Sequence, residues 1–127
     1  VEFFTGMALG VDTVACLAAL ELKHAGENIK VIAEVPCKNQ DCKWPIASQR
    51  MYKQLLDRCD KINLVSDKPY APYLMQLRNQ HMVDQLDLLI AVWDGTTGGT
   101  HNCVKYALSK DLNIIVIDPA NLNRGGF

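Results

Sequence analysis

Residues 88–108, LLIAVWDGTTGGTHNCVKYAL, decide the fold class of this chain. The stretch opens on a continuous apolar run, passes through a loop with three glycines and three threonines, and closes on apolar residues at helical spacing. Short apolar runs that are bounded by turn residues are typical of parallel strands covered on both faces. The stretch therefore predicts a buried strand, a loop and an amphipathic helix, which are the parts of a βαβ unit.

The same alternation extends over the whole chain. Apolar, β-rich runs predict strands at Glu2–Thr5, Ile29–Val35, Lys61–Val65, Leu88–Val92 and Asn113–Ile117. Between the strands, apolar residues recur with the period of a helix in four segments, at 11–22, 52–59, 74–86 and 103–108. This order predicts one α/β domain with a mainly parallel sheet of about five strands. We expect a single domain over residues 1–120 and a flexible tail over residues 121–127.

Length and charge argue against several classes of protein. The chain has 127 residues, with 13 Lys and Arg against 14 Asp and Glu. A near-neutral chain does not capture nucleic acid by broad electrostatic attraction, so we expect no nucleic-acid partner. No run of about 18 apolar residues is present, which predicts no membrane span. No signal peptide is visible and residue 1 is Val, so we expect a cytoplasmic chain that begins inside a longer gene product.

Five cysteines, an odd number, stand in a chain that is long enough to form a core: Cys16, Cys37, Cys42, Cys59 and Cys103. Disulfides are usual in small oxidised domains that lack a core, so we expect reduced thiols here. Cys37 and Cys42 flank a polar loop and form half of an alternative metal site, but no second ligand pair has metal spacing. We therefore predict no metal and no bound cofactor.

The loops that leave the strands carry the candidate site, because ligands of open α/β sheets bind in the crevice beyond the carboxyl ends of the strands. The first of these loops is Thr5–Asp12, TGMALGVD. Gly6 and Gly10 allow a sharp turn and the close approach of a ligand, and the following helix offers free N–H groups to an anion. The structural alternative is a tight turn in which Asp12 favours the helix dipole.

The loop at residues 93–102 is a stronger signal. Gly98, Gly99 and Thr100 stand directly before an amphipathic helix, which suits a phosphate cradle of backbone N–H groups and hydroxyls. The loop has no P-loop lysine, so it does not predict an ATPase. The alternative is that Thr100 only caps its helix.

Arg78 and three carboxylates are the remaining candidate site residues that follow from the amino-acid sequence itself. Arg78 lies on an otherwise apolar predicted helix, where it either faces solvent or binds phosphate as a bidentate donor. Asp12, Glu34 and Asp94 are the acidic residues near the expected crevice and are the candidate catalytic residues. Glycoside chemistry needs two carboxyl groups that face one bond, and the sequence does not show whether any two of these converge.

The segment Gly6–Asp12 resembles the GxxxGxD turn of DprA-like and YpsA-like proteins. The resemblance to YpsA-like proteins continues in order through Lys43-Trp44-Pro45, Lys68-Pro69-Tyr70, Arg78-Asn79 with Met82-Val83-Asp84, and Trp93-Asp94-Gly95 to Asn102-Cys103. It implies a Rossmann-like three-layer fold of the SLOG superfamily, whose members are proposed to bind nucleotides or NAD- and ADP-ribose-type ligands. It also implies a ligand-binding set: Gly6, Met7, Gly10, Asp12, Arg78, Asp94, Gly95, Gly98, Gly99 and Thr100.

Two departures from the pattern matter. YpsA-like proteins usually have an earlier strand and helix before the GxxxGxD turn, so we expect that N-terminal pair to be missing from this chain. The cytokinin-activating LOG phosphoribohydrolases of the same superfamily carry PGGxGTxxE, and matching its Gly-Thr to Gly99-Thr100 places Cys103 where the glutamate stands. Arg78 matches the arginine of their upstream Met-His-x-Arg-Lys motif. The resemblance therefore implies the binding half of that site rather than its hydrolytic half.

We predict that the chain binds or senses a nucleotide-derived ligand at the carboxyl edge of the sheet. The alternative is hydrolysis of a nucleotide N-glycosidic bond, with Asp12, Glu34 or Asp94 in place of the missing glutamate. DprA-like binding of single-stranded DNA is a third function, which the neutral charge and the lack of a basic, aromatic groove argue against. A pure interaction module is a fourth. Related superfamily members are often dimers or larger, which implies a homo-oligomer.

Overall fold

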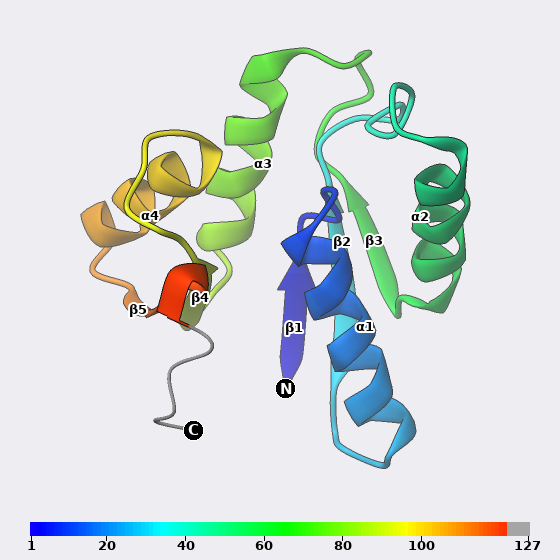
Figure 1. Ribbon diagram of the computed structural model, residues 1–127, viewed down its shortest axis with the longest axis horizontal. Coiled ribbons are helices and arrows are strands. Elements are labelled where there is room, and N and C mark those ends of the chain that lie inside the picture. The colour runs from blue at the N-terminus through cyan, green and yellow to red at the C-terminus, as the bar shows by residue number, and fades with distance from the viewer. Residues whose placement is uncertain (122–127) are drawn as a thin grey trace. The chain divides into compact units, whose positions relative to one another are not determined.

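Strands and helices alternate along the chain in the computed structural model, which describes residues 1–121 (Figure 1). The strands are β1 (Glu2–Thr5), β2 (Lys30–Val35), β3 (Lys61–Leu64), β4 (Leu88–Val92) and β5 (Asn113–Ile117). The helices are α1 (Val11–His24), α2 (Ile46–Arg58), α3 (Pro72–Val83) and α4 (Gly99–Ser109), and a short 3-10 helix, Pro119–Asn121, follows β5. The chain divides into two compact units, an N-terminal unit, Val1–Arg78, and a C-terminal unit that begins at Asn79.

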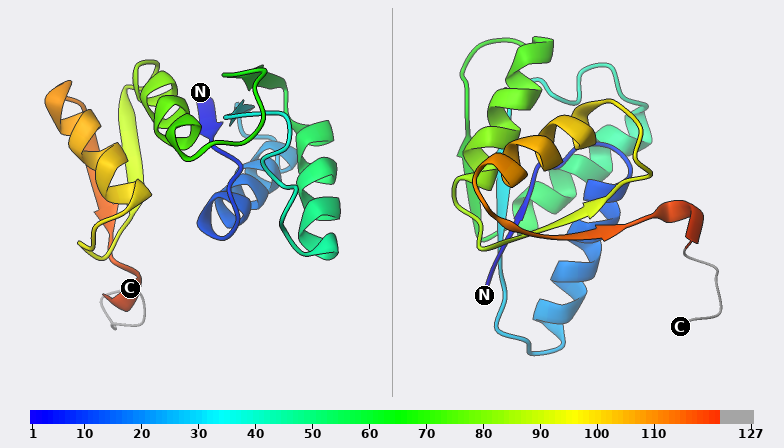
Figure 2. Two further views of the ribbon diagram at one scale, coloured as in Figure 1. Left: turned by 90° about the horizontal axis from the view of Figure 1, so that it is seen from above. Right: turned by 90° about the vertical axis from the view of Figure 1, so that its left-hand side faces the viewer.

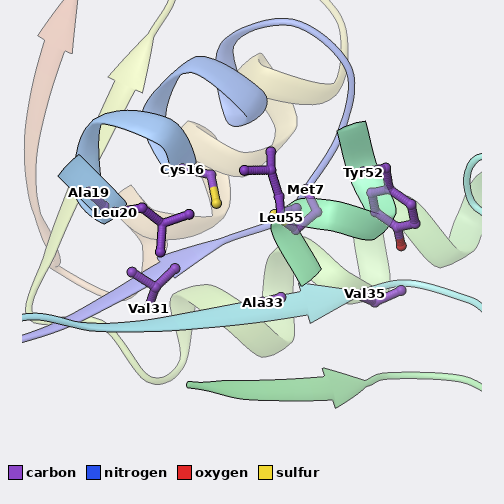
Figure 3. Packing of buried hydrophobic residues seen from close by; sticks show 9 residues of the cluster. All are labelled: Met7, Cys16, Ala19, Leu20, Val31, Ala33, Val35, Tyr52 and Leu55. Atoms are coloured by element: carbon purple, nitrogen blue, oxygen red, sulfur yellow. The ribbon is translucent and has the colours of Figure 1, made fainter. Parts of the chain in front are cut away.

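The N-terminal unit is built on a parallel sheet with the strand order β1-β2-β3. Successive side chains of a strand point to opposite faces of a sheet, so Val31, Ala33 and Val35 of β2 share one face. That face packs against α1 and α2, and the buried residues between them form the core: Met7, Cys16, Ala19, Leu20, Val31, Ala33, Val35, Tyr52 and Leu55 (Figure 3). Full burial of one large aliphatic side chain contributes roughly 1.5–3 kcal/mol, so this packing fixes α1 and the loop before it.

The C-terminal unit pairs β4 with β5 in parallel, with Leu89 opposite Ile114 and Ala91 opposite Val116. Helix α4 lies along this pair of strands (Figure 2). The apolar residues that meet between them are buried: Leu89, Ala91, Cys103, Val104 and Ala107, together with Val83. This packing fixes the start of α4 relative to the end of β4.

The structure confirms the α/β class, the parallel strands and the alternation of strand and helix. The five strands fall in two sheets, of three and two strands, and not in one sheet of about five. The pairing of strands depends on strand edges that the fold brings together from distant parts of the chain. An apolar run in the sequence therefore does not show which strands pair. The single domain over residues 1–120 stays a prediction. Of the expected tail, all but Asn121 lies outside the described residues.

No helix within residues 1–121 is long and apolar enough to cross a membrane.

Candidate functional site

The loop from Gly6 to Asp12, called here the Gly6–Asp12 loop, joins β1 to α1 and is closed by its own hydrogen bonds. The Thr5 hydroxyl oxygen accepts from the Met7 N–H at 3.2 Å, and the Asp12 carboxylate accepts from the Ala8 N–H at 3.1 Å through Oδ2. The Thr13 hydroxyl donates to the Ala8 carbonyl at 3.2 Å. Asp12 therefore shapes the turn with one of its two carboxylate oxygens.

Met7 holds the Gly6–Asp12 loop to the core. It has a positive φ of 57°, which is uncommon for a residue other than glycine, and its side chain is 1% exposed. A side chain that fills the core compensates for the backbone strain, because strain of this kind persists only where the surrounding structure determines it.

Arg78 lies beneath the same loop. Its side chain is 4% exposed, and its Nη1 donates to the Gly6 carbonyl and, at 3.5 Å, to the Glu34 carbonyl. A Cβ placed on Gly6 would meet the guanidinium group, so only glycine lets the loop approach Arg78 this closely. The alternative that Arg78 faces solvent is therefore wrong.

Gln40 also supports the Gly6–Asp12 loop from the interior. This residue is 5% exposed, and its Nε2 lies 3.4 Å from three acceptors: the Gly6 carbonyl, the Met7 carbonyl and the Tyr52 hydroxyl oxygen. Its Oε1 has no hydrogen-bond partner among the described residues. Burial raises the pKa of the Tyr52 hydroxyl, which keeps it neutral beside the amide.

Glu34 is the most deeply buried of the candidate carboxylates. It lies on β2 with no exposed surface, and its Oε1 accepts from the Asn63 amide of β3 at 2.7 Å. A buried carboxylate is stable only where hydrogen bonds or charges compensate for lost hydration. Its position inside the N-terminal unit suits a structural role more than a reaction with a ligand in solvent.

The loop from Gly95 to Thr100, called here the Gly95–Thr100 loop, joins β4 to α4 and begins the helix without a side-chain cap. Gly98 is the residue before the helix and has a φ of 147°, and the first helical hydrogen bond runs from the Asn102 N–H to the Gly98 carbonyl at 3.0 Å. The alternative that Thr100 caps the helix is therefore wrong. A Cβ on Gly99 would meet nothing within 4 Å, so the backbone here is open.

Asp94 stiffens the Gly95–Thr100 loop from its N-terminal side. Its Oδ1 accepts from the Thr96 N–H at 3.0 Å and from the Thr96 hydroxyl at 2.6 Å. These hydrogen bonds hold the pKa of the Asp94 carboxyl below its usual range, because they stabilise the ionised form. Asp94 is therefore an exposed carboxylate that is ionised at neutral pH.

Two aromatic rings flank the Gly95–Thr100 loop. The Trp93 indole N–H donates to the Thr96 carbonyl at 2.8 Å, and the Trp93 ring stacks on His101 with centroids 5.6 Å apart and planes 15° apart. The stack joins the end of β4 to the first turn of α4.

The structure thus distributes the sequence candidates between two loops, one in each unit. Gly6, Met7, Gly10 and Asp12 lie in the Gly6–Asp12 loop with Arg78 beneath it. Gly95, Gly98, Gly99 and Thr100 lie in the Gly95–Thr100 loop, which Asp94 directly precedes. Sequence reasoning missed Gln40 and the stack of Trp93 on His101. The polar run Lys38-Asn39-Gln40-Asp41 was the only signal for Gln40. No cluster of His, Cys, Asp and Glu within residues 1–121 has the arrangement of a metal site.

The family of the chain follows from comparison with known proteins. The model of the YpsA family, described as the YspA SLOG family, matches residues 1–122. This chain belongs to the YpsA family. The match includes both loops, so the glycines of the Gly6–Asp12 and Gly95–Thr100 loops stand within a family domain.

Individual relatives agree with this family. The chain is 37% identical over 117 residues to the SPbeta prophage-derived protein YoqJ of Bacillus subtilis (strain 168), covering 84% of this chain and 68% of YoqJ. It is 26% identical over 99 residues to a UPF0398 protein of Halalkalibacterium halodurans, covering 77% of this chain and 52% of that protein. It is 24% identical over 103 residues to a UPF0398 protein of Bacillus thuringiensis (strain Al Hakam), at 80% and 56% coverage. The chain thus spans just over half the length of these two UPF0398 proteins.

Proposed function

We propose that this member of the YpsA family binds or senses a nucleotide-derived ligand, an NAD- or ADP-ribose-type molecule or a nucleoside phosphate. Membership of a SLOG family supports a nucleotide-related function. The observation that carries the proposal is the uncapped start of α4 at Gly98 and Gly99, with open space beside the backbone.

A phosphate group fits the start of α4 for electrostatic reasons. The first N–H groups of a helix lack partners within the helix, and the helix dipole places partial positive charge at the same end. Glycine at positions 98 and 99 leaves these N–H groups accessible, and the Thr100 hydroxyl adds a further donor. A phosphate at this position gains several hydrogen bonds without the desolvation of a buried charge.

Asp94 is suited to the sugar of such a ligand. Its Oδ1 is used by Thr96, whereas its Oδ2 has no hydrogen bond to another described residue. An ionised carboxylate is a strong acceptor for the paired hydroxyls of ribose. In this proposal phosphate is bound by Gly98, Gly99 and Thr100, and the ribose is bound by Asp94.

The Gly6–Asp12 loop supports the same function in the N-terminal unit. Its helix, α1, also starts at a glycine and has no side-chain cap, and Asp12 keeps its Oδ1 for a ligand hydroxyl. Arg78 supplies a buried positive charge directly beneath the loop, which lowers the cost of bringing an anion to it. In this proposal Arg78 neutralises phosphate charge and also holds the Gly6 carbonyl inward.

Hydrolysis of an N-glycosidic bond is the alternative, and the candidate carboxylates do not favour it. A general acid needs a raised pKa, whereas the pKa of Asp94 is lowered. Asp12 is used by the loop backbone and Glu34 is fully buried. We therefore propose binding rather than turnover, in a chain whose thiols suit the reducing cytoplasm.

A thermal-shift screen tests the proposal with phosphate, AMP, ADP, ADP-ribose and NAD. A ligand that binds the native state raises the melting temperature by mass action. We expect the shift given by wild type to persist in Gly99→Ala and to disappear in Gly99→Asp, because the added carboxylate repels phosphate. A Cβ at position 99 meets nothing within 4 Å, and Asp at the first position of a helix favours folding, so we expect both variants to fold and the loss of the shift to report on binding.

An equal ligand shift in Gly99→Asp and wild type would show that phosphate is not bound at the start of α4. No shift with any of the five compounds would contradict the proposed ligand class.

A further inference from the structure

The indole of Trp93 and the imidazole of His101 form a stacked aromatic pair beside the Gly95–Thr100 loop. Their ring centroids are 5.6 Å apart and their planes are inclined by 15°. Nearly parallel planes at this centroid distance describe offset stacking, which aromatic rings favour over a face-to-face sandwich. Both side chains are half-buried, so the pair is part of the surface of the C-terminal unit.

The plane of the Trp93 ring is fixed by its neighbours. The indole N–H donates to the Thr96 carbonyl at 2.8 Å. Thr96 is held in turn by Asp94, which accepts from the Thr96 N–H at 3.0 Å and from the Thr96 hydroxyl at 2.6 Å. Trp93 also packs against the buried residues between α4 and its sheet. His101 is therefore stacked on a ring that cannot turn freely.

The His101 ring has capacity for a further contact. Trp93 stacks on one of its two faces, and within residues 1–121 the imidazole has no other ring contact and no hydrogen-bond partner. His101 directly follows Thr100 in the first turn of α4. Because one turn of a helix rises only about 5.4 Å, a small ligand can contact both the backbone at Gly99 and the ring of His101.

We infer that the Trp93–His101 pair is a stacking surface for the base of the ligand, so that an intact nucleotide binds more tightly than a sugar phosphate. The inference rests on the proposed function, in which Gly98, Gly99 and Thr100 bind the phosphate. Every nucleobase has a flat π-face, and stacking of a base on an aromatic side chain raises affinity on the order of 10- to 100-fold. A surface that is already rigid gains this affinity without a further ordering cost.

A stacking surface predicts little discrimination among the bases. Selective recognition of one base requires hydrogen bonds to its edge, whereas stacking uses the face that all bases share. The indole N–H of Trp93 is already used by the Thr96 carbonyl, so it does not read a base edge. We therefore expect AMP and GMP to bind with dissociation constants within roughly fivefold of each other.

The test compares AMP with ribose 5-phosphate, which has the same phosphate and sugar but no base. Isothermal titration calorimetry measures the dissociation constants of both compounds for wild type and for His101→Ala. We expect wild type to bind AMP about tenfold or more tightly than ribose 5-phosphate, and this ratio to fall close to one in His101→Ala. The ratio is the readout, because a purely structural role of His101 would weaken both compounds together.

Two variants supply the matched controls. His101→Phe keeps a flat ring without the imidazole nitrogens, so it should keep the preference for AMP. Asn102→Ala changes an exposed neighbour in the same turn and should behave as wild type does. Alanine is the best helix former, so we expect both alanine variants to fold.

Three results would overturn the inference: no binding of AMP to wild type, equal binding of AMP and ribose 5-phosphate to wild type, or a preference that His101→Ala leaves unchanged. Loss of the preference in His101→Phe would also overturn it, because the contact would then be a hydrogen bond and not stacking. The proposed function is decided separately, by the thermal shifts of wild type and Gly99→Asp with the wider set of compounds.

Discussion

The two glycine-containing loops each lead from a strand into a helix that follows a glycine, but they are held in different ways. The Gly6–Asp12 loop is held from below by Arg78 and Gln40, which are buried and distant from it in sequence. The Gly95–Thr100 loop is held by its own neighbours, through Asp94 and Thr96, which are exposed, and Trp93, which is half-buried. The same kind of loop is thus part of a core in one unit and a surface feature in the other.

This difference decides whether the effect of a substitution on ligand binding can be measured separately from its effect on folding stability. Substitutions around the Gly6–Asp12 loop change buried hydrogen bonds, so their effect on any ligand is mixed with an effect on folding. In the Gly95–Thr100 loop a Cβ added at Gly99 meets nothing within 4 Å, so the effect of a substitution there on binding is measured on a folded protein. Three further predictions test the comparison.

The largest effect is expected for Arg78→Met. The variant keeps an apolar stem but leaves the carbonyls of Gly6 and Glu34 without this buried donor, which should lower the free energy of unfolding by about 2–4 kcal/mol. Urea unfolding measures the change, and Arg50→Met, at an exposed position of α2, should change it by less than about 0.5 kcal/mol. Equal stability of the two variants would mean that Arg78 does not hold the loop.

An intermediate effect is expected for Gly98→Ala, with Gly99→Ala as its matched control. The φ of 147° at Gly98 disfavours any side chain, so its replacement should cost about 1–2 kcal/mol. Gly99 has no such conformation and its Cβ meets nothing, so Gly99→Ala should be neutral or should stabilise by about 0.4–1 kcal/mol. Chemical denaturation should therefore distinguish neighbouring glycines, and identical midpoints would contradict the loop geometry.

The smallest effect is expected in the pH dependence of stability at Asp94. Its pKa is lowered in the folded state, so its hydrogen bonds stabilise the protein above the unfolded pKa of about 3.9 and are lost as the pH falls through the folded pKa. Asp94→Asn should be less stable than wild type at pH 7, and the difference should shrink below about pH 4. A difference that grows in acid would reverse the assigned direction of the shift.

A control for this pH profile is available at Asp67, an exposed aspartate that follows β3. We expect Asp67→Asn to leave the stability close to that of wild type at neutral pH, because surface substitutions usually change it by less than about 0.5 kcal/mol.

Much of the fold could be predicted because it depends on local patterns. The apolar runs located every strand to within one residue, and β1, β4 and β5 were predicted with their observed bounds. The helical periods located the four helices less closely, because the segment predicted at 52–59 begins six residues after the start of α2 at Ile46. The division of five strands into two sheets could not be predicted, since pairing is decided by strand edges that meet after folding. The glycine positions also predicted both loops, because glycine is favoured where the backbone turns sharply or approaches another group closely.

The contacts that hold the loops could not be predicted. Arg78 is 72 positions from Gly6, and Gln40 is 34 positions from it. A single sequence does not show which residues so far apart along the chain are in contact. The sequence was therefore also consistent with an Arg78 that faces solvent.

Met7 has a consequence for the kinetics of the Gly6–Asp12 loop. Because its side chain is part of the core, the loop cannot open while that core stays closed, and its amide protons at Met7 and Ala8 should exchange with solvent only during large unfolding events. A molecule arriving at this loop meets it in its final shape. The association rate is then set by diffusion and orientation, without a slow ordering step.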